Sequence, residues 1–282
     1  MKLDMHCHTK EGSPDGKTNL LDNIAILQEK GFDGMLIADH NSYKAYRYYK
    51  KLKNKPENFT VLCGIEYDTA DAGHMLVIMP SGFCPRLMEL RGMPVLLLVE
   101  VVHLLGGILG PAHPCGEKFL SFCSTRRGRL LKDKLLKKFD FLEVYNACED
   151  NSANKAAKEL ALAYQLPGFG GSDSHKDDCI GLGYTELQEK VHNESEFIQY
   201  IKDGLPVCAA GTHYFHTTKQ KLGKANNILV YSFWFYNKFL ALFRSKARKV
   251  ELLKSCELHP VGRFGTKYIT LTNRNVSNEN HF

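Results

Sequence analysis

The N-terminal stretch KLDMHCHTKEGSPDG, residues 2–16, contains two histidines and an aspartate whose side chains can bind metal. His6 and His8 are separated by Cys7, and Asp15 follows seven residues after His8. In a chain with 12 histidines, one His-x-His pattern is close to what chance produces, so it is weak evidence by itself. Its significance depends on which other residues fold beside it.

Other residues of metal-binding types lie at the ends of predicted strands. In a barrel of parallel strands, the carboxyl ends of the strands form one face, and active sites lie there. His74 instead begins its strand, so we expect a hairpin to bring it to the same face. The nine candidates at strand ends are His6, His8, Asp39, His40, Glu66, His74, His113, Asp173 and His175, and Asp15 of the opening stretch is a further candidate.

Histidine and carboxylate together are ligands of zinc, manganese and iron rather than of calcium. Nine such groups are too many for one tetrahedral ion, and they fit a cluster of two or three divalent ions with a bridging carboxylate and a bound hydroxide. Asp39 is interpreted as support for His40, or as a helix cap, and not as a ligand. Because side chains alternate along a strand, Cys7 should point away from His6 and His8.

The elements that must position these residues alternate between strands and helices. Apolar runs predict strands, and apolar residues at helical spacing predict helices. Seven or so βα units in about 205 residues fit a closed barrel better than a doubly wound sheet, and the alternation favours parallel strands. The predicted strands are 2–6, 33–40, 60–66, 73–79, 107–114, 139–146, 167–175 and 183–187. The predicted helices are 18–32, 42–53, 94–106, 128–138, 152–166 and 194–203.

Composition is that of a globular protein with one large α/β domain or a domain plus an appendage. The formal charge of +6 is only mildly basic, so charge alone does not indicate a nucleic-acid partner. The nine cysteines are odd in number and include no C-x-x-C pair, and residues 1–15 are too polar for a secretory signal. These features predict reduced thiols and a cytoplasmic location.

The character of the chain changes near residue 211. We expect a barrel over 1–210 and an appendage over 211–282, with an apolar helix at 228–243, a basic flank and a polar tail. The apolar block is short for a transmembrane helix, which needs about 20 residues. Three interpretations stay open: packing on the barrel, which is preferred, a subunit interface, and contact of 228–249 with an anionic membrane surface.

Eight short motifs resemble those of the PHP (polymerase and histidinol phosphatase) domain. They occur in the order and with gaps similar to those of that family, and together they cover roughly residues 1–210. The motifs are DMHCHT at 4–9, SPDG at 13–16, ADHN at 38–41, GIE at 64–66, GHMLV at 73–77, AHP at 112–114, EVYN at 143–146 and GSDSH at 171–175.

The resemblance implies a distorted (β/α)7 TIM-like barrel with a trinuclear metal site. Carried over position by position, it implies one ion held by His6, His8, Glu66 and Asp173. It implies a second ion held by the bridging Glu66 with His74 and His113, and a third held by Asp15, His40 and His175. All nine positions are filled by residues able to bind metal, which favours a competent enzyme.

The resemblance also implies an activity, a metal-dependent phosphoesterase that hydrolyses a small phosphomonoester or phosphodiester with a metal-bound hydroxide. A nucleotide or an oligonucleotide end is the expected substrate class, with no stable nucleic-acid complex, and Asp173 or His175 is expected to move the leaving-group proton. The alternatives are a histidinol-phosphate-type phosphatase and a non-catalytic PHP accessory module. The metal (zinc, manganese or iron), the substrate and the oligomeric state stay open.

A basic loop follows the strand that carries His113. Arg126 and Arg127 lie in STRRGR, residues 124–129, where a bidentate arginine could bind a substrate phosphate. The alternative is a solvated basic loop without a ligand.

Overall fold

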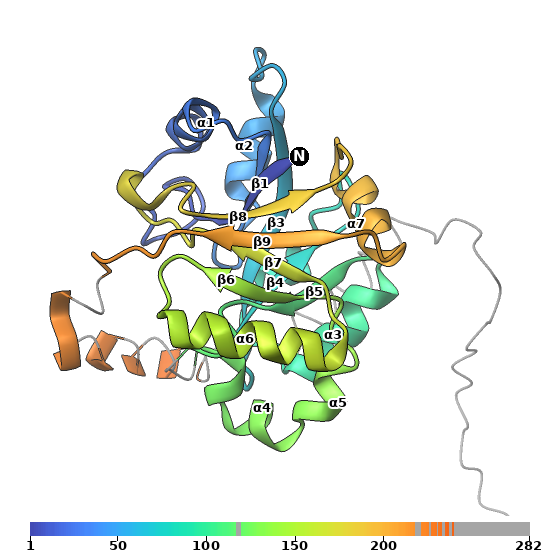
Figure 1. Ribbon diagram of the computed structural model, residues 1–282, viewed down its shortest axis with the longest axis vertical. Coiled ribbons are helices and arrows are strands. Elements are labelled where there is room, and N and C mark those ends of the chain that lie inside the picture. The colour runs from blue at the N-terminus through green and yellow to red at the C-terminus, as the bar shows by residue number, and fades with distance from the viewer. Residues whose placement is uncertain are drawn as a thin grey trace, which may run out of the picture.

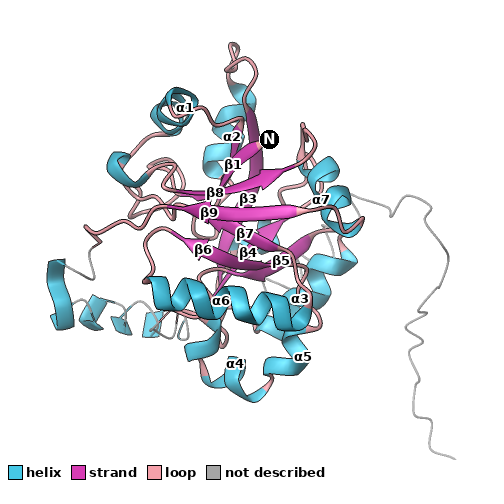
Figure 2. Ribbon diagram, viewed as in Figure 1, coloured by secondary structure: helices cyan, strands magenta, loops and turns pink. Residues whose placement is uncertain are grey.

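The computed structural model describes residues 1–116, 120–217, 221–225, 227–229, 231–232, 235–236 and 239. Strands form the centre and helices surround them, as Figures 1 and 2 show. The strands are β1 Lys2–Cys7, β2 Gly34–Ile37, β3 Thr60–Asp68, β4 His74–Ile78, β5 Ile108–Pro111, β6 Leu142–Asn146, β7 Gly168–Gly171, β8 Gly183–Leu187 and β9 Val207–Gly211. The helices are α1 Leu20–Glu29, α2 Lys44–Lys51, α3 Val95–Leu104, α4 Arg126–Leu130, α5 Lys132–Leu136, α6 Asn151–Tyr164 and α7 Glu194–Lys202.

The strands form a curled sheet and a smaller sheet that closes it. The order in the large sheet is β5-β4-β3-β2-β1-β8-β9, and β6 and β7 pair with each other. The β7 strand contacts β1 and β9, and the backbone N–H of Gly170 donates to the hydroxyl of Thr185 on β8 at 2.8 Å. The expected distorted, PHP-type α/β barrel is therefore confirmed.

The expected all-parallel arrangement is wrong in detail. Pairs β1–β2, β2–β3 and β6–β7 are parallel, whereas β3–β4, β4–β5, β1–β8 and β8–β9 are antiparallel. Apolar runs reveal that a strand is buried but not its direction, which explains the error. The β3–β4 hairpin is the one expected around His74, because Asp68 and His74 face each other in its register.

Most helices begin and end close to the expected residues. Asn19 caps α1, because its side chain accepts a hydrogen bond from the backbone N–H of Asp22 at 2.9 Å. The single helix expected over 128–138 is instead two short helices, since Leu131 leaves the helical region of φ and ψ. The β9 strand was not predicted.

Two clusters of buried side chains fill the protein. The larger lies between the sheet and the helices that cover it, and it includes residues of α1, α2 and α3. The smaller takes residues from the large sheet together with Phe141 just before β6, Phe169 of β7 and Phe197 of α7, so the two sheets enclose it. The ring centroids of Phe141 and Phe169 are 4.1 Å apart.

The first strand changes register between Asp4 and Cys7. Met5 belongs to the enclosed cluster, whereas Cys7 belongs to the cluster under the helices. Cys7 is fully buried there, as expected for a residue that points away from His6 and His8.

No helix among the described residues is long and apolar enough to cross a membrane. Most of the apolar helix expected at 228–243, and the basic flank and polar tail after it, lie outside the described residues.

We expect Phe169→Ala to lower the free energy of unfolding by about 3–5 kcal/mol, because it opens a cavity between the two sheets. Phe169 is fully buried, whereas Phe215 is 68% exposed, so Phe215→Ala is the matched control and should change stability by less than about 0.5 kcal/mol. Urea unfolding followed by circular dichroism measures both. Equal midpoints for the two variants would contradict the proposed packing of the sheets.

Candidate metal centre

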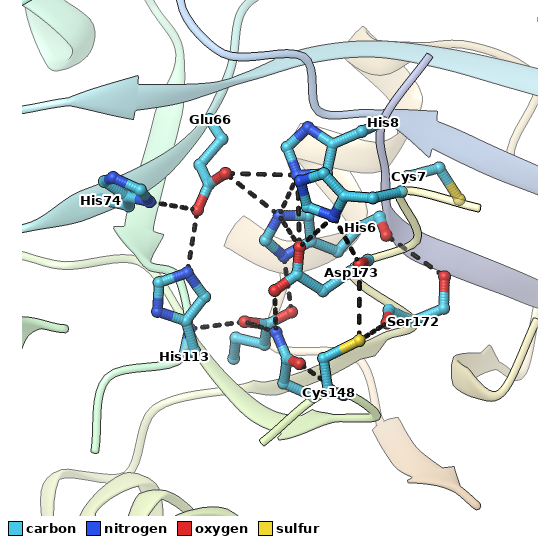
Figure 3. A network of polar contacts seen from close by, with 12 residues as sticks. His6, Cys7, His8, Glu66, His74, His113, Cys148, Ser172 and Asp173 are labelled. Atoms are coloured by element: carbon cyan, nitrogen blue, oxygen red, sulfur yellow. Dashed lines mark hydrogen bonds and ion pairs between the residues drawn. The ribbon is translucent and has the colours of Figure 1, made fainter. Parts of the chain in front are cut away.

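The structure brings all nine ligands that the resemblance implies together at one end of the curled sheet. His6 lies in β1 and His8 follows it, Glu66 lies in β3, and His74 begins β4. His40 bridges to Glu66 after β2, and His113, Asp173 and His175 follow β5 and β7. Figure 3 shows six of them, His6, His8, Glu66, His74, His113 and Asp173, pointing toward one another, while Cys7 points away.

The side chains of His6, His8, Glu66 and Asp173 bring their donor atoms close together. The Nε2 atoms of His6 and His8 are 3.2 Å apart. His6 Nε2 is 3.5 Å from Glu66 Oε2 and 3.6 Å from Asp173 Oδ1, and His8 Nε2 is 3.3 Å from each. Donors that sit about 2.1 Å from one ion at the corners of a tetrahedron lie about 3.4 Å apart. His6, His8 and Asp173 thus offer three donors close enough together to hold one ion, and Glu66 Oε2 lies beside the two histidines.

The second oxygen of Glu66 faces two more histidines. Oε1 is 2.8 Å from His74 Nδ1 and 2.9 Å from His113 Nε2. One carboxylate thus presents one oxygen to His6 and His8 and the other to His74 and His113. This is the arrangement of a carboxylate that bridges two ions.

A third group lies at the rim. Asp15 Oδ2 is 3.5 Å from His40 Nε2 and 3.3 Å from His175 Nε2. The rings of His8 and His175 stack with centroids 4.1 Å apart, and ring nitrogens of His8, His40 and His175 lie close enough together to hold an ion.

The side chains of the centre are buried on one side and exposed on the other. The side chains of His6 and His8 are fully buried and that of Glu66 is 1% exposed, whereas His175 is 30% and Asp15 52% exposed. The Asp15 and His175 side is therefore the one through which solvent and a ligand reach the centre.

The polar groups of the centre hold one another in charged forms. Burial alone would lower the pKa of His6, but the charges of Glu143 and Asp173 raise it well above its usual value. Burial would raise the pKa of Glu66, but the neighbouring His74 and His40 bring it well below its usual value. This network stabilises positive charge at its centre, and divalent cations can replace protons there.

The same balance holds at the two histidines nearer the surface. Burial disfavours the charged form of His113, yet its hydrogen bond to Glu66 raises its pKa to about 9. Burial likewise opposes the charge on His175, and its hydrogen bond to Asp15 raises its pKa to about 9.

Two buried carboxylates that contact these histidines were not predicted. Glu143 Oε1 is 2.8 Å from His6 Nδ1, and its Oε2 accepts the backbone N–H of His113 at 2.5 Å. This contact leaves Nε2 of His6 to face the centre, as in other carboxylate–histidine–metal arrangements. Glu143 is the first residue of the EVYN motif and the second residue of β6, so an acidic residue inside a buried strand was the available signal.

Asp68 is the second of these carboxylates. Its Oδ1 is 3.4 Å from His40 Nδ1 and 3.2 Å from His74 Nε2, and Asn41 donates its side-chain amide to Oδ2. The strand predicted to end at Glu66 continues to Asp68, which places this carboxylate beside the centre.

Asp39 was expected to support His40 or to cap a helix, but its hydrogen bonds go to Thr9. Asp39 accepts hydrogen bonds from the backbone N–H of Thr9 at 2.7 Å and from its hydroxyl at 2.8 Å, and α2 has no side-chain cap. Asp39 therefore fixes the loop after β1, and neither His40 nor the helix.

The two arginines expected to bind substrate begin α4. Arg126 is exposed, and Arg127 Nε donates to Asp71 Oδ2 at 3.0 Å. Asp71 precedes β4, the strand that begins with His74. Their role toward a ligand stays a prediction.

Sequence comparison supports the PHP resemblance over part of the chain. Residues 151–205, which run from α6 to α7 and include Asp173 and His175, match a family model described as PHP-associated. No curated protein sequence matches the chain.

Solved structures share the fold at low sequence identity. PsfC from Pseudomonas syringae PB-5123 is 16% identical with a TM-score of 0.53, and the match covers 82% of this chain and 98% of PsfC. A two-domain protein from Bacteroides vulgatus ATCC 8482 that contains a predicted PHP-like metal-dependent phosphoesterase is 16% identical with a TM-score of 0.53, over 75% of this chain and 65% of that one.

Endonuclease Q, in complex with a 27-mer duplex substrate with an abasic lesion at the active site, is 16% identical with a TM-score of 0.54. The match covers 75% of this chain and 60% of that one, so the chain spans less than two thirds of this protein and of the Bacteroides protein. These likenesses show that the chain shares the fold of these structures, and residues 151–205 match the PHP-associated model.

We expect Glu143→Gln to weaken binding of Mn²⁺ or Zn²⁺ by about 10- to 100-fold, because the amide no longer accepts firmly from His6 or offsets its charge. Glu100 carries a carboxylate that is 66% exposed and pairs with Lys138, so Glu100→Gln is the matched control. Isothermal titration of metal-stripped protein measures both affinities. An unchanged affinity in Glu143→Gln would show that Glu143 does not support the site.

Proposed function

We propose that this protein is a metal-dependent phosphoesterase that hydrolyses a small phosphomonoester or phosphodiester. The observation that carries the proposal is the geometry around Glu66, whose two oxygens face separate pairs of histidines. Bound divalent ions lower the pKa of water and offset the charge of a phosphate, so a site with several ions suits phosphate-ester hydrolysis.

In this proposal the residues divide between the ions as the PHP resemblance implies. His6, His8, Glu66 and Asp173 would hold the buried ion, Glu66 with His74 and His113 the second, and Asp15, His40 and His175 the ion at the rim. Zinc, manganese and iron all suit these ligands.

We assign proton transfer to the leaving group to His175, with Asp173 as the alternative. His175 is the most exposed histidine of the centre, and its Nδ1 is 3.0 Å from the backbone carbonyl of Asp173. A general acid must reach the leaving oxygen, and a rim position allows this, whereas the buried His6 and His8 cannot do so.

A nucleotide or an oligonucleotide end is the substrate class that we favour. The fold shared with Endonuclease Q, whose structure holds a duplex substrate, supports including nucleic-acid phosphodiesters among the compounds tested. Histidinol phosphate and simple phosphomonoesters belong in the same panel.

The competing proposal is a PHP module without catalysis. We expect metal analysis of protein produced with added manganese or zinc to find more than one ion per chain, because donors for two further ions surround the first. Less than one ion per chain would favour the non-catalytic module.

We expect His8→Ala to reduce metal-dependent hydrolysis by at least about 100-fold, because it removes a donor of the buried ion. His103, which pairs with Asp140 outside the centre at 2.9 Å, gives the matched control His103→Ala, which should stay active. Chelation should abolish activity and added Mn²⁺ or Zn²⁺ should restore it. Equal activity in His8→Ala and wild type would place the reaction elsewhere.

We expect Arg126→Ala combined with Arg127→Ala to raise the KM for a phosphate ester about tenfold, which corresponds to one charge-assisted hydrogen bond of about 1.5 kcal/mol. The kcat should change little, since neither arginine contacts the proposed metal ligands. Arg86→Ala, at another exposed arginine, is the control. A KM equal to that of wild type would leave these arginines without a role in substrate binding.

A further inference from the structure

A row of large apolar side chains near the C-terminus faces solvent. Residues 227–229, 231–232, 235–236 and 239 are helical, and successive helical residues turn by about 100°. At that spacing the apolar residues among them occupy one broad face. We call this the C-terminal apolar face, and it consists of Ile228, Leu229, Tyr231, Phe235, Tyr236 and Phe239.

The side chains of this face are at least half exposed. Ile228 is 74% exposed, Phe235 66% and Phe239 52%. The rings of Phe235 and Phe239 lie parallel with centroids 6.5 Å apart, as residues four apart on a helix can. A contiguous exposed apolar patch of this kind marks a surface that binds a membrane or another molecule.

The charge of the surrounding sequence is all of one sign. Residues 204–250 contain eight lysines and arginines and no aspartate or glutamate. The whole chain carries +6, so the other residues together are net negative. The basic residues of this segment are Lys219, Lys221, Lys224, Lys238, Arg244, Lys246, Arg248 and Lys249.

The apolar face lies on the same side of the barrel as the metal centre. Arg91 Cζ is 5.1 Å from the ring centroid of Tyr236, and Arg91 Nη2 is 3.4 Å from Asp68 Oδ2 beside the centre. In Figure 1 the orange helical segment lies on the side toward which β6 and β9 run. A surface that covered this face would therefore lie close to the opening of the centre.

We propose that the C-terminal apolar face binds a membrane surface rich in anionic lipid, with its aromatic side chains among the headgroups. An exposed aromatic and aliphatic face, in a stretch of sequence rich in lysine and arginine, is typical of helices that lie in the membrane interface. Lipid is favoured over a second copy of the chain, because two such segments would bring like charges together. It is favoured over nucleic acid, because Ile228 and Leu229 offer phosphates and bases nothing polar.

The test is sedimentation of the full-length protein with vesicles. We expect binding to phosphatidylcholine vesicles with about 30% phosphatidylglycerol, little binding to pure phosphatidylcholine, and a steep loss with added salt. Phe235→Asp combined with Phe239→Asp should reduce binding at least about tenfold. Leu104→Asp combined with Leu162→Asp is the matched control, since both leucines are exposed on other helices, and it should bind as wild type does.

The outcomes separate lipid from the other partners. No sedimentation of wild type with anionic vesicles overturns the proposal, as does equal binding of the two double variants. A dimer in gel filtration that Phe235→Asp with Phe239→Asp dissociates, without vesicle binding, would assign the face to a second copy. Binding of a short duplex without vesicle binding would assign it to nucleic acid. The salt dependence of wild type tests the charge argument without any variant.

Discussion

The centre depends on one buried carboxylate. Glu66 is 1% exposed and contacts five imidazoles, those of His6, His8, His40, His74 and His113, at 2.8–3.5 Å. A carboxylate in the interior of a barrel costs several kcal/mol unless it is fully paired, so each of these contacts must be delivered accurately. These contacts require the registers of β1, β3 and β4 and the paths of the loops after β2 and β5 that the structure shows.

The departures from a regular barrel follow from that requirement. The antiparallel hairpin turns β4 back so that His74, at its start, lies opposite Asp68 and beside Glu66. His113 and Asp173 have φ values of 31° and 51°, in the left-handed region that residues other than glycine rarely adopt. Such backbone costs about 1–3 kcal/mol and persists where the surroundings determine it. For His113 the determinant is visible, because Glu143 accepts its backbone N–H.

The sequence was sufficient to find the site residues that lie at strand ends. It was insufficient for contacts that depend on the direction of a strand or on how side chains meet in the fold. His6, His40 and Glu66 could be placed because polar residues that close buried apolar runs collect at one edge of a sheet. Glu143 lies near the start of β6 and not at its end, and only the fold shows that it contacts His6. The β9 strand, VCAAG, has too weak an apolar alternation to be recognised, and it is held by pairing with β8. Strand direction was misjudged because burial of both faces looks alike in parallel and antiparallel pairs.

The balance of charge around the centre limits what can enter it. Asp15, Glu66, Asp68, Glu143 and Asp173 place five carboxylates within reach of the same histidines, and several of these groups have pKa values below the usual range. A phosphate ester, the substrate class proposed above, would be repelled by this set until cations offset it. Positive charge that could attract an anion lies on Arg91, beside Asp68, and on the exposed Arg126. The carboxylates of the centre thus favour cations, and the arginines around it favour anions. The two regions meet at the exposed rim formed by Asp15 and His175.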